Sequence, residues 1–292
     1  MLSLHTNAAA LSAQNSIGAT QSRLSTSMTR LSTGFRINSA MDDAAGLQIA
    51  TRLKAQTSGM AMAMRNTQNS ISMMQTAEGA FDEVTNMLVR MKDLATQAAD
   101  ASSTTADKTA MQSEFDALTN ELSNVMGNTS FGGSALLKDT SGTLSTAGGV
   151  NFQIGASTAE TMTFDVSGSI ATLHGSLLAA SAEYSSTGTA STTAGAELTG
   201  AASATIDLLS TAIDDVGTVR SALGAASNRL DHVYNNLSNI STNTQAATGR
   251  IMDVDYASET SNMTSQQMLM QAGTAMLKQS NSMSSLVMSL LQ

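Results

Sequence analysis

The 292-residue chain contains no cysteine and no proline. Without cysteine it has neither disulfides nor thiolate metal ligands, and cysteine usage gives no information on its redox compartment. Without proline it lacks the residue that most strongly interrupts helices, so very long helices become possible. Tryptophan is also absent, and aromatic residues make up 3% of the chain. These absences exclude a core built mainly from aromatic rings.

Charge is scarce as well. Charged residues form 13% of the chain, about half the usual globular share, and the net charge is −9. An acidic chain is a poor partner for nucleic acid or an anionic membrane surface. No segment reaches the roughly 18–20 apolar residues that a membrane span requires. The first basic residue is Arg23, unlike a secretory signal, so cytosolic residence and export without a signal peptide both fit.

A seven-residue repeat of apolar side chains runs along residues 53–98 and again along residues 205–245. Two apolar tracks offset by three or four residues are typical of a coiled-coil seam. At about 1.5 Å per residue the two segments measure roughly 60–70 Å, so they are expected to pair as antiparallel helices. The predicted seam residues are Leu53, Met60, Met74, Phe81, Leu209, Val216, Leu223, Leu230 and Leu237.

Each end of the chain carries a wide, nearly uncharged apolar stripe. A helix cannot bury such a stripe by itself, so a monomer is expected to leave it exposed or disordered. The stripes therefore predict self-assembly, and a helical bundle that packs them within one chain is the alternative. Their methionines indicate flexible apolar filler, not a metal site. The predicted self-assembly residues are Leu4, Leu11, Ile17, Leu24, Leu31, Leu269, Met276, Met283, Leu286 and Leu290.

The middle of the chain has a different pattern. Apolar residues alternate along residues 150–154 and again along residues 162–166, with glycine between them, which predicts a β-hairpin. Residues 181–204 are low in complexity and rich in Ser, Thr, Gly and Ala, so they are expected to face solvent.

The predicted fold is mainly α, a long antiparallel coiled-coil rod with a small β-hairpin region in the middle of the chain. Terminal helices are expected to form an inner core layer in a polymer. The predicted segments are an N-terminal core helix (1–40), N-terminal rod helices (41–130), the hairpin and surface region (131–204), a C-terminal rod helix (205–250) and a C-terminal core helix (251–292).

Two adjacent carboxylates, Asp42 and Asp43, precede the first coiled-coil segment. Ser39 stands three residues before Asp42, which is the spacing of a helix N-terminus, and the two carboxylates are expected in the first turn. A metal site would need further ligands, yet no Asp, Glu or His follows until Glu78. Ser39, Asp42 and Asp43 are therefore predicted to cap a helix, with no metal bound.

Four blocks of the sequence, taken in order, resemble bacterial flagellin, the filament subunit of the flagellum. The resemblance covers the chain apart from about 170–204, and the short centre is similar to a minimal flagellin without large outer domains. The opening MLSLHTN resembles that of lateral-type flagellins. The blocks are LSTGFRINSAMDDAAGLQIATRL (31–53), QTAEGAFDEVTNMLVRMKDLATQAA (75–99), FGGSALL (131–137) and the segment 230–291.

The resemblance implies a structural subunit that self-assembles into the extracellular filament used for motility, after export through the flagellar type III apparatus. It implies as partners other copies of the chain, the junction and cap proteins, and an export chaperone. A hook–filament junction protein of the flagellum is the alternative. No hydrolase, P-loop or dinucleotide motif occurs, so neither catalytic residues nor a cofactor is expected.

One segment, LVRMKDLATQ (88–97), matches the part of many flagellins that a host Toll-like receptor binds. The resemblance implies that the receptor contacts are Leu88, Arg90, Leu94 and, on the neighbouring helix, Glu114.

Overall fold

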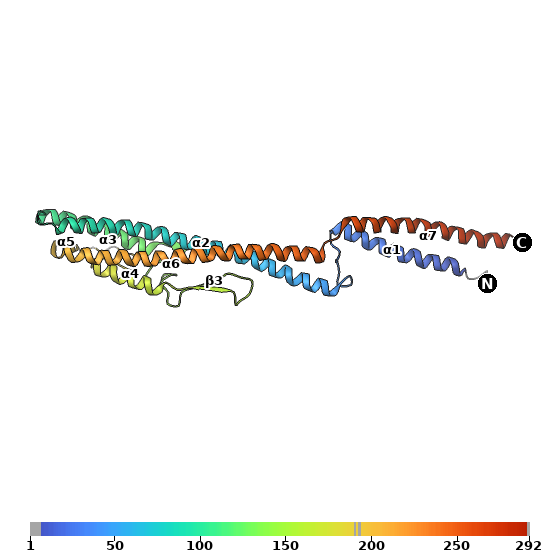
Figure 1. Ribbon diagram of the computed structural model, residues 1–292, viewed down its shortest axis with the longest axis horizontal. Helices are drawn as coiled ribbons and strands as arrows, with labels where there is room; N and C mark the ends of the chain where they lie inside the picture. The colour runs from blue at the N-terminus through green and yellow to red at the C-terminus, as the bar shows by residue number, and fades with distance from the viewer. Residues whose placement is uncertain (1–6, 190, 192–193, 291–292) are drawn as a thin grey trace. The chain divides into compact units, whose positions relative to one another are not determined.

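The computed structural model describes residues 7–189, 191 and 194–290, and side chains as far as residue 283. The fold is mainly α with a small β region (Figure 1), which confirms the predicted class. Its elements are α1 (Ala8–Thr33), α2 (Ala44–Ala99), α3 (Thr105–Asn128), β1 (Ser130–Phe131), β2 (Ser134–Ala135), β3 (Val150–Gln153), β4 (Thr161–Phe164), α4 (Ser167–Ala180), α5 (Glu197–Gly200), α6 (Ala202–Met252) and α7 (Tyr256–Leu290).

The chain divides into two units. The terminal unit comprises residues 1–57 and 242–292, and the central unit comprises residues 58–241. Helices α2 and α6 contribute residues to both. The two units are described separately below.

In the central unit, α2 and α6 pack against each other along the predicted seam. Met60 clusters with Leu237, while Asp82 forms an ion pair with Arg220 at an N–O distance of 3.2 Å, so the two helices run antiparallel. Buried positions on α6 recur every three or four residues, as in a coiled coil. The buried seam residues are Met60, Met74, Phe81, Leu209, Val216, Leu223, Leu230 and Leu237. Leu53, in the terminal unit, is half-buried.

Two further helices complete this core. Helix α3 contributes Phe115, Leu122 and Met126, and α4 contributes Ile170 and Leu173. Helix α4 was not predicted, because residues 131–204 had been assigned to a hairpin and a surface region. Its apolar spacing is helical but spans only four turns, too short to stand out beside the long heptad tracks.

The predicted hairpin is confirmed. Strands β3 and β4 pair antiparallel, with Val150 opposite Phe164 and Phe152 opposite Met162. Phe152, Met162 and Phe164 are buried in the core, so one face of the hairpin covers the helices. A second, two-residue hairpin turns at Gly132 and Gly133, whose φ angles of 60° and 87° are those that a tight hairpin turn demands of glycine.

The expectation that residues 181–204 face solvent is wrong for part of the segment. Ser181, Glu183, Tyr184 and Leu198 are buried. Polar side chains along one face of α3 accept the segment's backbone N–H groups and hold it in place. The hydrogen bonds are Gln112 Oε1 with the N–H of Leu198 at 2.7 Å, Asp116 Oδ2 with Gly195 at 3.2 Å, Asn120 Oδ1 with Ser191 at 2.8 Å, and Ser123 Oγ with Ser185 at 3.0 Å.

His174 connects α4 to two loops, the one that follows β2 and the one that follows α4. Its Nε2 lies 2.9 Å from the carbonyl oxygen of Leu137 and therefore carries the proton, while its Nδ1 accepts from the Tyr184 hydroxyl at 2.6 Å. Burial lowers the pKa of His174, outweighing the opposite effects of the Leu137 carbonyl and the Asp139 charge. The imidazole is thus held neutral, as this hydrogen-bond pattern requires.

Alanine substitution of a leucine in α6 tests which face of this helix packs in the seam. Leu209 is fully buried, whereas its neighbour Leu208 is 37% exposed. Leu209→Ala is expected to lower the free energy of unfolding by about 2–5 kcal/mol, and Leu208→Ala to change it by about 0.5 kcal/mol or less. Denaturant unfolding followed by circular dichroism measures both, and equal losses would contradict the assigned seam.

Acid is expected to lower the free energy of unfolding, because protonation of His174 removes the lone pair with which its Nδ1 accepts the hydrogen bond from Tyr184. Because the folded-state pKa is below the unfolded value of about 6.5, the unfolded chain takes up the proton first as the pH falls through that value. Stability is therefore fully present above it and is lost below it. Denaturant unfolding of wild type and His174→Gln at pH 7.5 and 5.5 checks this, with the variant expected to lose less. Equal losses would rule out the anchor as the titrating group.

Candidate functional site

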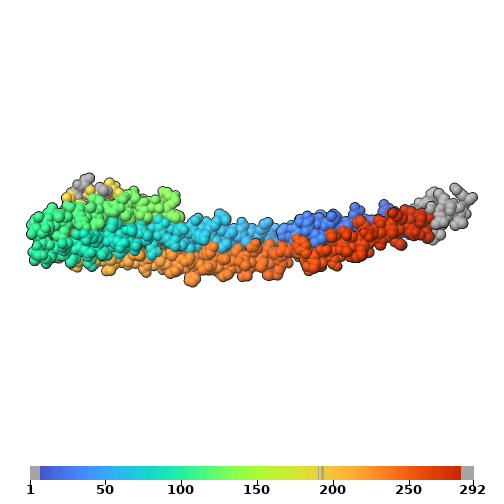
Figure 2. Space-filling model, turned by 90° about the horizontal axis from the view of Figure 1, so that it is seen from above, coloured from blue at the N-terminus to red at the C-terminus, as the bar shows by residue number. Residues whose placement is uncertain are grey.

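In the terminal unit, α1 and α7 lie side by side (Figures 1 and 2). The side chain of Asn7 donates to the Ser280 hydroxyl at 3.1 Å, and further along the pair Arg30 Nη1 lies 3.8 Å from Glu259 Oε2. The two helices therefore run antiparallel. Half-buried or buried positions recur every three or four residues on both helices: Ala13, Ile17, Thr20, Leu24, Ser27 and Leu31 on α1, and Glu259, Met263, Gln266, Met270, Gly273 and Leu277 on α7.

The seam between these helices is narrow. A Cβ atom placed on Gly273 would lie 2.9 Å from Cγ1 of Ile17, so the glycine allows α1 to approach closely. Among the described residues of α1, only Ser27 reaches full burial. Burial of apolar area supplies most of the stability of a helix pair. The α1–α7 pairing buries only part of the apolar area of these two helices.

Three apolar residues of α7 point away from the seam. Leu269, Met276 and Met283, spaced by seven residues, are 54%, 66% and 60% exposed. We call these three residues the outer stripe. Leu11 on α1 is similarly open, at 62%. Exposed apolar residues in regular register are typical of an interaction surface.

The predicted self-assembly residues are thus divided between two faces. Ile17, Leu24 and Leu31 are half-buried in the seam with α7, so the single chain covers these three in part. Packing within one chain, which is the alternative, is seen in part for these three residues. Leu11 and the outer stripe stay open. Leu4 and the side chains of Leu286 and Leu290 lie outside the described residues.

The connections beside α1 and α7 are tied to each other. The N–H of Arg36 donates to the carbonyl oxygen of Met252 at 2.6 Å, and the N–H of Val254 donates to that of Gly34 at 3.0 Å. Gly34 ends α1 with a φ of 75°, where a side chain would be strained. These backbone bonds hold the link from α1 to α2 against the link from α6 to α7.

The sequence predicted that Asp42 and Asp43 lie in the first turn of a helix. In the structure both residues precede α2, which begins at Ala44. Asp43 Oδ1 instead accepts the N–H of Gly46 at 2.8 Å, which is the hydrogen bond of an N-cap residue. Asp43 is therefore the cap.

Asp42 and Ser39 close the turn that precedes this cap. Asp42 Oδ2 accepts the N–H groups of Ser39 and Asn38 at 2.8 and 3.1 Å, and the Ser39 hydroxyl accepts from Met41. The bond from Ser39, followed by that from Asn38, holds the pKa of Asp42 below its ordinary value. These hydrogen bonds fix the local backbone geometry, and Asp42 Oδ1 also lies 4.0 Å from Arg30 Nη2 on α1.

The implied receptor residues are not all accessible. Leu88 and Leu94 are buried in the central core, so the folded chain does not present these two side chains on its surface. Arg90 and Glu114 are about half exposed and joined by hydrogen bonds of 2.8 and 2.6 Å. Only this pair of the four residues remains available.

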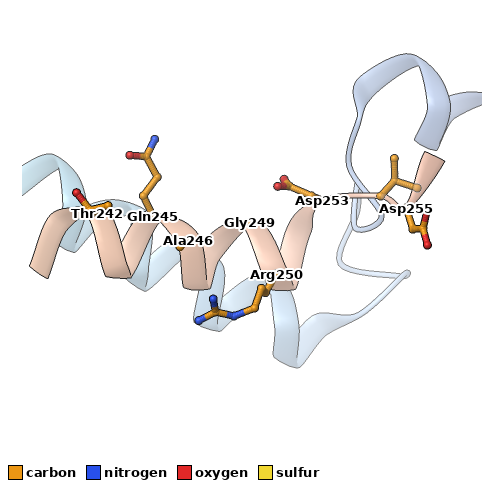
Figure 3. Close-up of a pocket in the computed structure, with 8 residues that line it drawn as sticks. Thr242, Gln245, Ala246, Gly249, Arg250, Asp253 and Asp255 are labelled. Atoms are coloured by element: carbon orange, nitrogen blue, oxygen red, sulfur yellow. The ribbon is translucent and has the colours of Figure 1, made fainter. Parts of the chain in front are cut away.

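The hollow in Figure 3 offers little for a small ligand. It encloses about 640 Å³, is open to solvent, and is lined by residues 242–255 of α6 and the link to α7. The side chains of Arg250 and Asp253 project to opposite sides of the ribbon, so they do not converge on one point. Within the described part of the chain, no group of three His, Asp or Glu residues is placed to hold a metal ion. A search of the same residues finds no helix long and apolar enough for a bilayer span.

Comparison with known proteins gives consistent matches. Residues 4–142 match the bacterial flagellin N-terminal helical region, and residues 206–291 match the bacterial flagellin C-terminal helical region. The chain is 37% identical over 287 residues to a flagellin of Halalkalibacterium halodurans, an alignment that covers 98% of each protein.

Other matches are partial. The chain is 47% identical over 165 residues to polar flagellin F of Vibrio parahaemolyticus, which covers 56% of this chain and 42% of that protein. The match thus spans less than half the length of that relative. A solved structure assigned to a flagellar hook-associated protein from the same species has a TM-score of 0.53 at 16% identity, covering 73% of this chain and 100% of the other, and shows a shared fold.

Two glycine substitutions test the α1–α7 seam. At Gly273 a new methyl group meets Ile17, whose branched side chain has little freedom, and overpacking costs about 1–3 kcal/mol. At Gly18 nothing lies within 4 Å, so alanine should stabilise α1 by about 0.5–1 kcal/mol. Hydrogen exchange of the monomer should show faster exchange in both helices for Gly273→Ala and slower exchange in α1 for Gly18→Ala. Unchanged protection in Gly273→Ala would be evidence against the seam.

Proposed function

Because the chain belongs to the bacterial flagellin family, we propose that it is the repeating subunit of a helical flagellar filament. The family is one of structural proteins, not of enzymes. The observation that carries the proposal is the outer stripe, an apolar surface that the chain's own α1–α7 pairing leaves open. In a homopolymer, other copies of α1 and α7 would cover it.

The energetics favour such an assembly. Each leucine or methionine of the outer stripe gains roughly 1.5–3 kcal/mol on burial, before ordering costs. Part of the ordering cost is already met, because α1 and α7 hold each other helical in the single chain. Charge repulsion between copies is also small, since Lys278 is the only charged residue from 260 to 283.

A hook–filament junction protein is the alternative function. The hook-associated structural neighbour, at 16% identity, supports a common fold and no more. The higher identity to flagellins, 37% over 98% of the chain, favours the filament. Quantifying the chain in appendages sheared from cells separates the two functions, because a filament subunit is the main component and a junction protein a trace one.

Localisation and partners follow as part of the same proposal. The chain would leave the cell through the flagellar type III apparatus and act in the extracellular filament, with junction and cap proteins at the two filament ends. An export chaperone would cover α7 beforehand. The exposed outer stripe supports the proposal of a chaperone, because an uncovered apolar surface on an unassembled chain would promote premature association.

Recognition by a host Toll-like receptor is a second proposal, now confined to Arg90 and Glu114. The exposed ion pair joins α2 to α3 and presents a guanidinium next to a carboxylate on the central unit. Val89, beside it, is 45% exposed and adds apolar area. Leu88 and Leu94 would act by holding the helices in register.

Charge placed on the outer stripe is expected to prevent elongation. In Leu269→Asp/Met276→Asp both substitutions lie at exposed sites, so the monomer should remain folded, with a circular dichroism spectrum like that of wild type. Burying two unpaired carboxylates between copies should abolish seeded growth, which light scattering measures. Gln271→Asp, at another exposed position of α7, is the matched control and should elongate. Normal filaments from the double variant would refute the assigned surface.

Loss of the Arg90–Glu114 pair is expected to weaken receptor signalling by the isolated monomer. Arg90→Ala and Glu114→Ala each remove an exposed charge and change stability little, since such pairs contribute about 0–1 kcal/mol. A reporter assay in receptor-expressing cells measures potency. Arg229→Ala, at an exposed position of α6 in the same unit, controls for a general loss of charge. Unchanged potency for both variants would exclude this contact.

A further inference from the structure

Three methionines of α7 are accessible to solvent, whereas the methionines in the core of the central unit are not. Met268, Met276 and Met283 are 60%, 66% and 60% exposed. In the central core, by contrast, methionines are almost completely buried: Met60, Met74, Met91, Met126 and Met162. The core methionines are thus shielded from solvent, while those of α7 are open to it, as are Met28, Met41 and Met62 outside α7.

The exposed set coincides with the surface on which assembly depends. Met276 and Met283 form two thirds of the outer stripe, and Met268 precedes its third member, Leu269. Two other methionines of α7, Met263 and Met270, are half-buried in the seam with α1. Chemistry confined to the exposed thioethers would therefore change the outer face of α7 and leave the α1–α7 seam intact.

Peroxide reacts with an accessible thioether. The sulfur lone pair attacks one oxygen of hydrogen peroxide, the O–O bond breaks, and the other oxygen leaves as water after taking up a proton. The sulfur is oxidised by two electrons to the sulfoxide, and the peroxide is reduced by the same two electrons. The product replaces an apolar, flexible side chain with a polar one that resists burial in an apolar contact.

We propose that Met268, Met276 and Met283 form an oxidation site through which peroxide blocks assembly of the free chain. This inference rests on the proposed filament function. In the monomer the three sulfurs are open, and oxidation leaves the fold unchanged because none of them packs in a core. In a filament the outer stripe is covered by neighbouring copies, so assembled subunits resist the same dose. A methionine sulfoxide reductase reverses the block.

The test compares three proteins, each normalised to its own untreated growth on filament seeds. They are wild type, Met268→Leu/Met276→Leu/Met283→Leu, and the matched control Met41→Leu/Met62→Leu, whose two methionines are exposed elsewhere. Dilute monomers receive hydrogen peroxide, peptide mass spectrometry maps the sulfoxides, and light scattering follows elongation. The fully buried Met74 serves as the internal unreactive site.

We expect sulfoxides at the three α7 sites before Met74, and a rise of roughly tenfold or more in the critical concentration of wild type, since each sulfoxide forfeits the burial of one side chain. The Met41/Met62 control should be inhibited equally. The triple leucine variant should keep its growth, and reductase treatment should restore wild type.

Two results would overturn the inference alone: wild type elongating unchanged with Met276 and Met283 oxidised, or the triple leucine variant losing as much growth as wild type. Failure of untreated wild type to elongate on seeds would instead refute the proposed function, and this inference with it.

Discussion

A helix that carries apolar residues on two faces can bury only one of them against a single partner helix. Helix α7 is in this position: Met263, Met270 and Leu277 lie in the seam with α1, while the outer stripe remains in water. The terminal unit is therefore folded but still exposes apolar side chains to water. In the proposed filament, other copies of the chain would cover the second face, and this constraint links the sequence of the chain ends to the proposed function.

The central unit buries the apolar faces of its long helices within itself. Its long helices have one apolar face each, and α3, α4 and the β3–β4 hairpin cover what the α2–α6 seam leaves open. Hydrogen bonds from polar side chains fix the loops on this core. His174 bonds to two loops, and side chains of α3 bond to residues 181–204. The described apolar core therefore lies in the central unit, whereas the outer stripe lies in the terminal unit.

The sequence predicted the features that periodicity encodes. A seven-residue repeat identifies which residues of α2 and α6 are buried, because the seam follows a fixed helical phase. Periodicity could not decide which of the two α7 tracks meets α1, since both repeat every seven residues. Nor could it reveal the docking of residues 181–204, because the donors there are backbone N–H groups that every sequence supplies. The resemblance implied a receptor contact at Leu88, but the heptad track marks this residue as a core position, and the structure buries it.

The absence of cysteine allows the central claim to be tested with one introduced thiol at a time. Met276→Cys places the thiol on the outer stripe, and Met263→Cys places it in the seam. Maleimide labelling rates are then measured on dilute monomers and on filaments. The account predicts fast labelling at 276 in the monomer, strong protection there in the filament, and slow labelling at 263 in both. Equal labelling at 276 in the two states would show that assembly does not cover the outer stripe and would contradict the account.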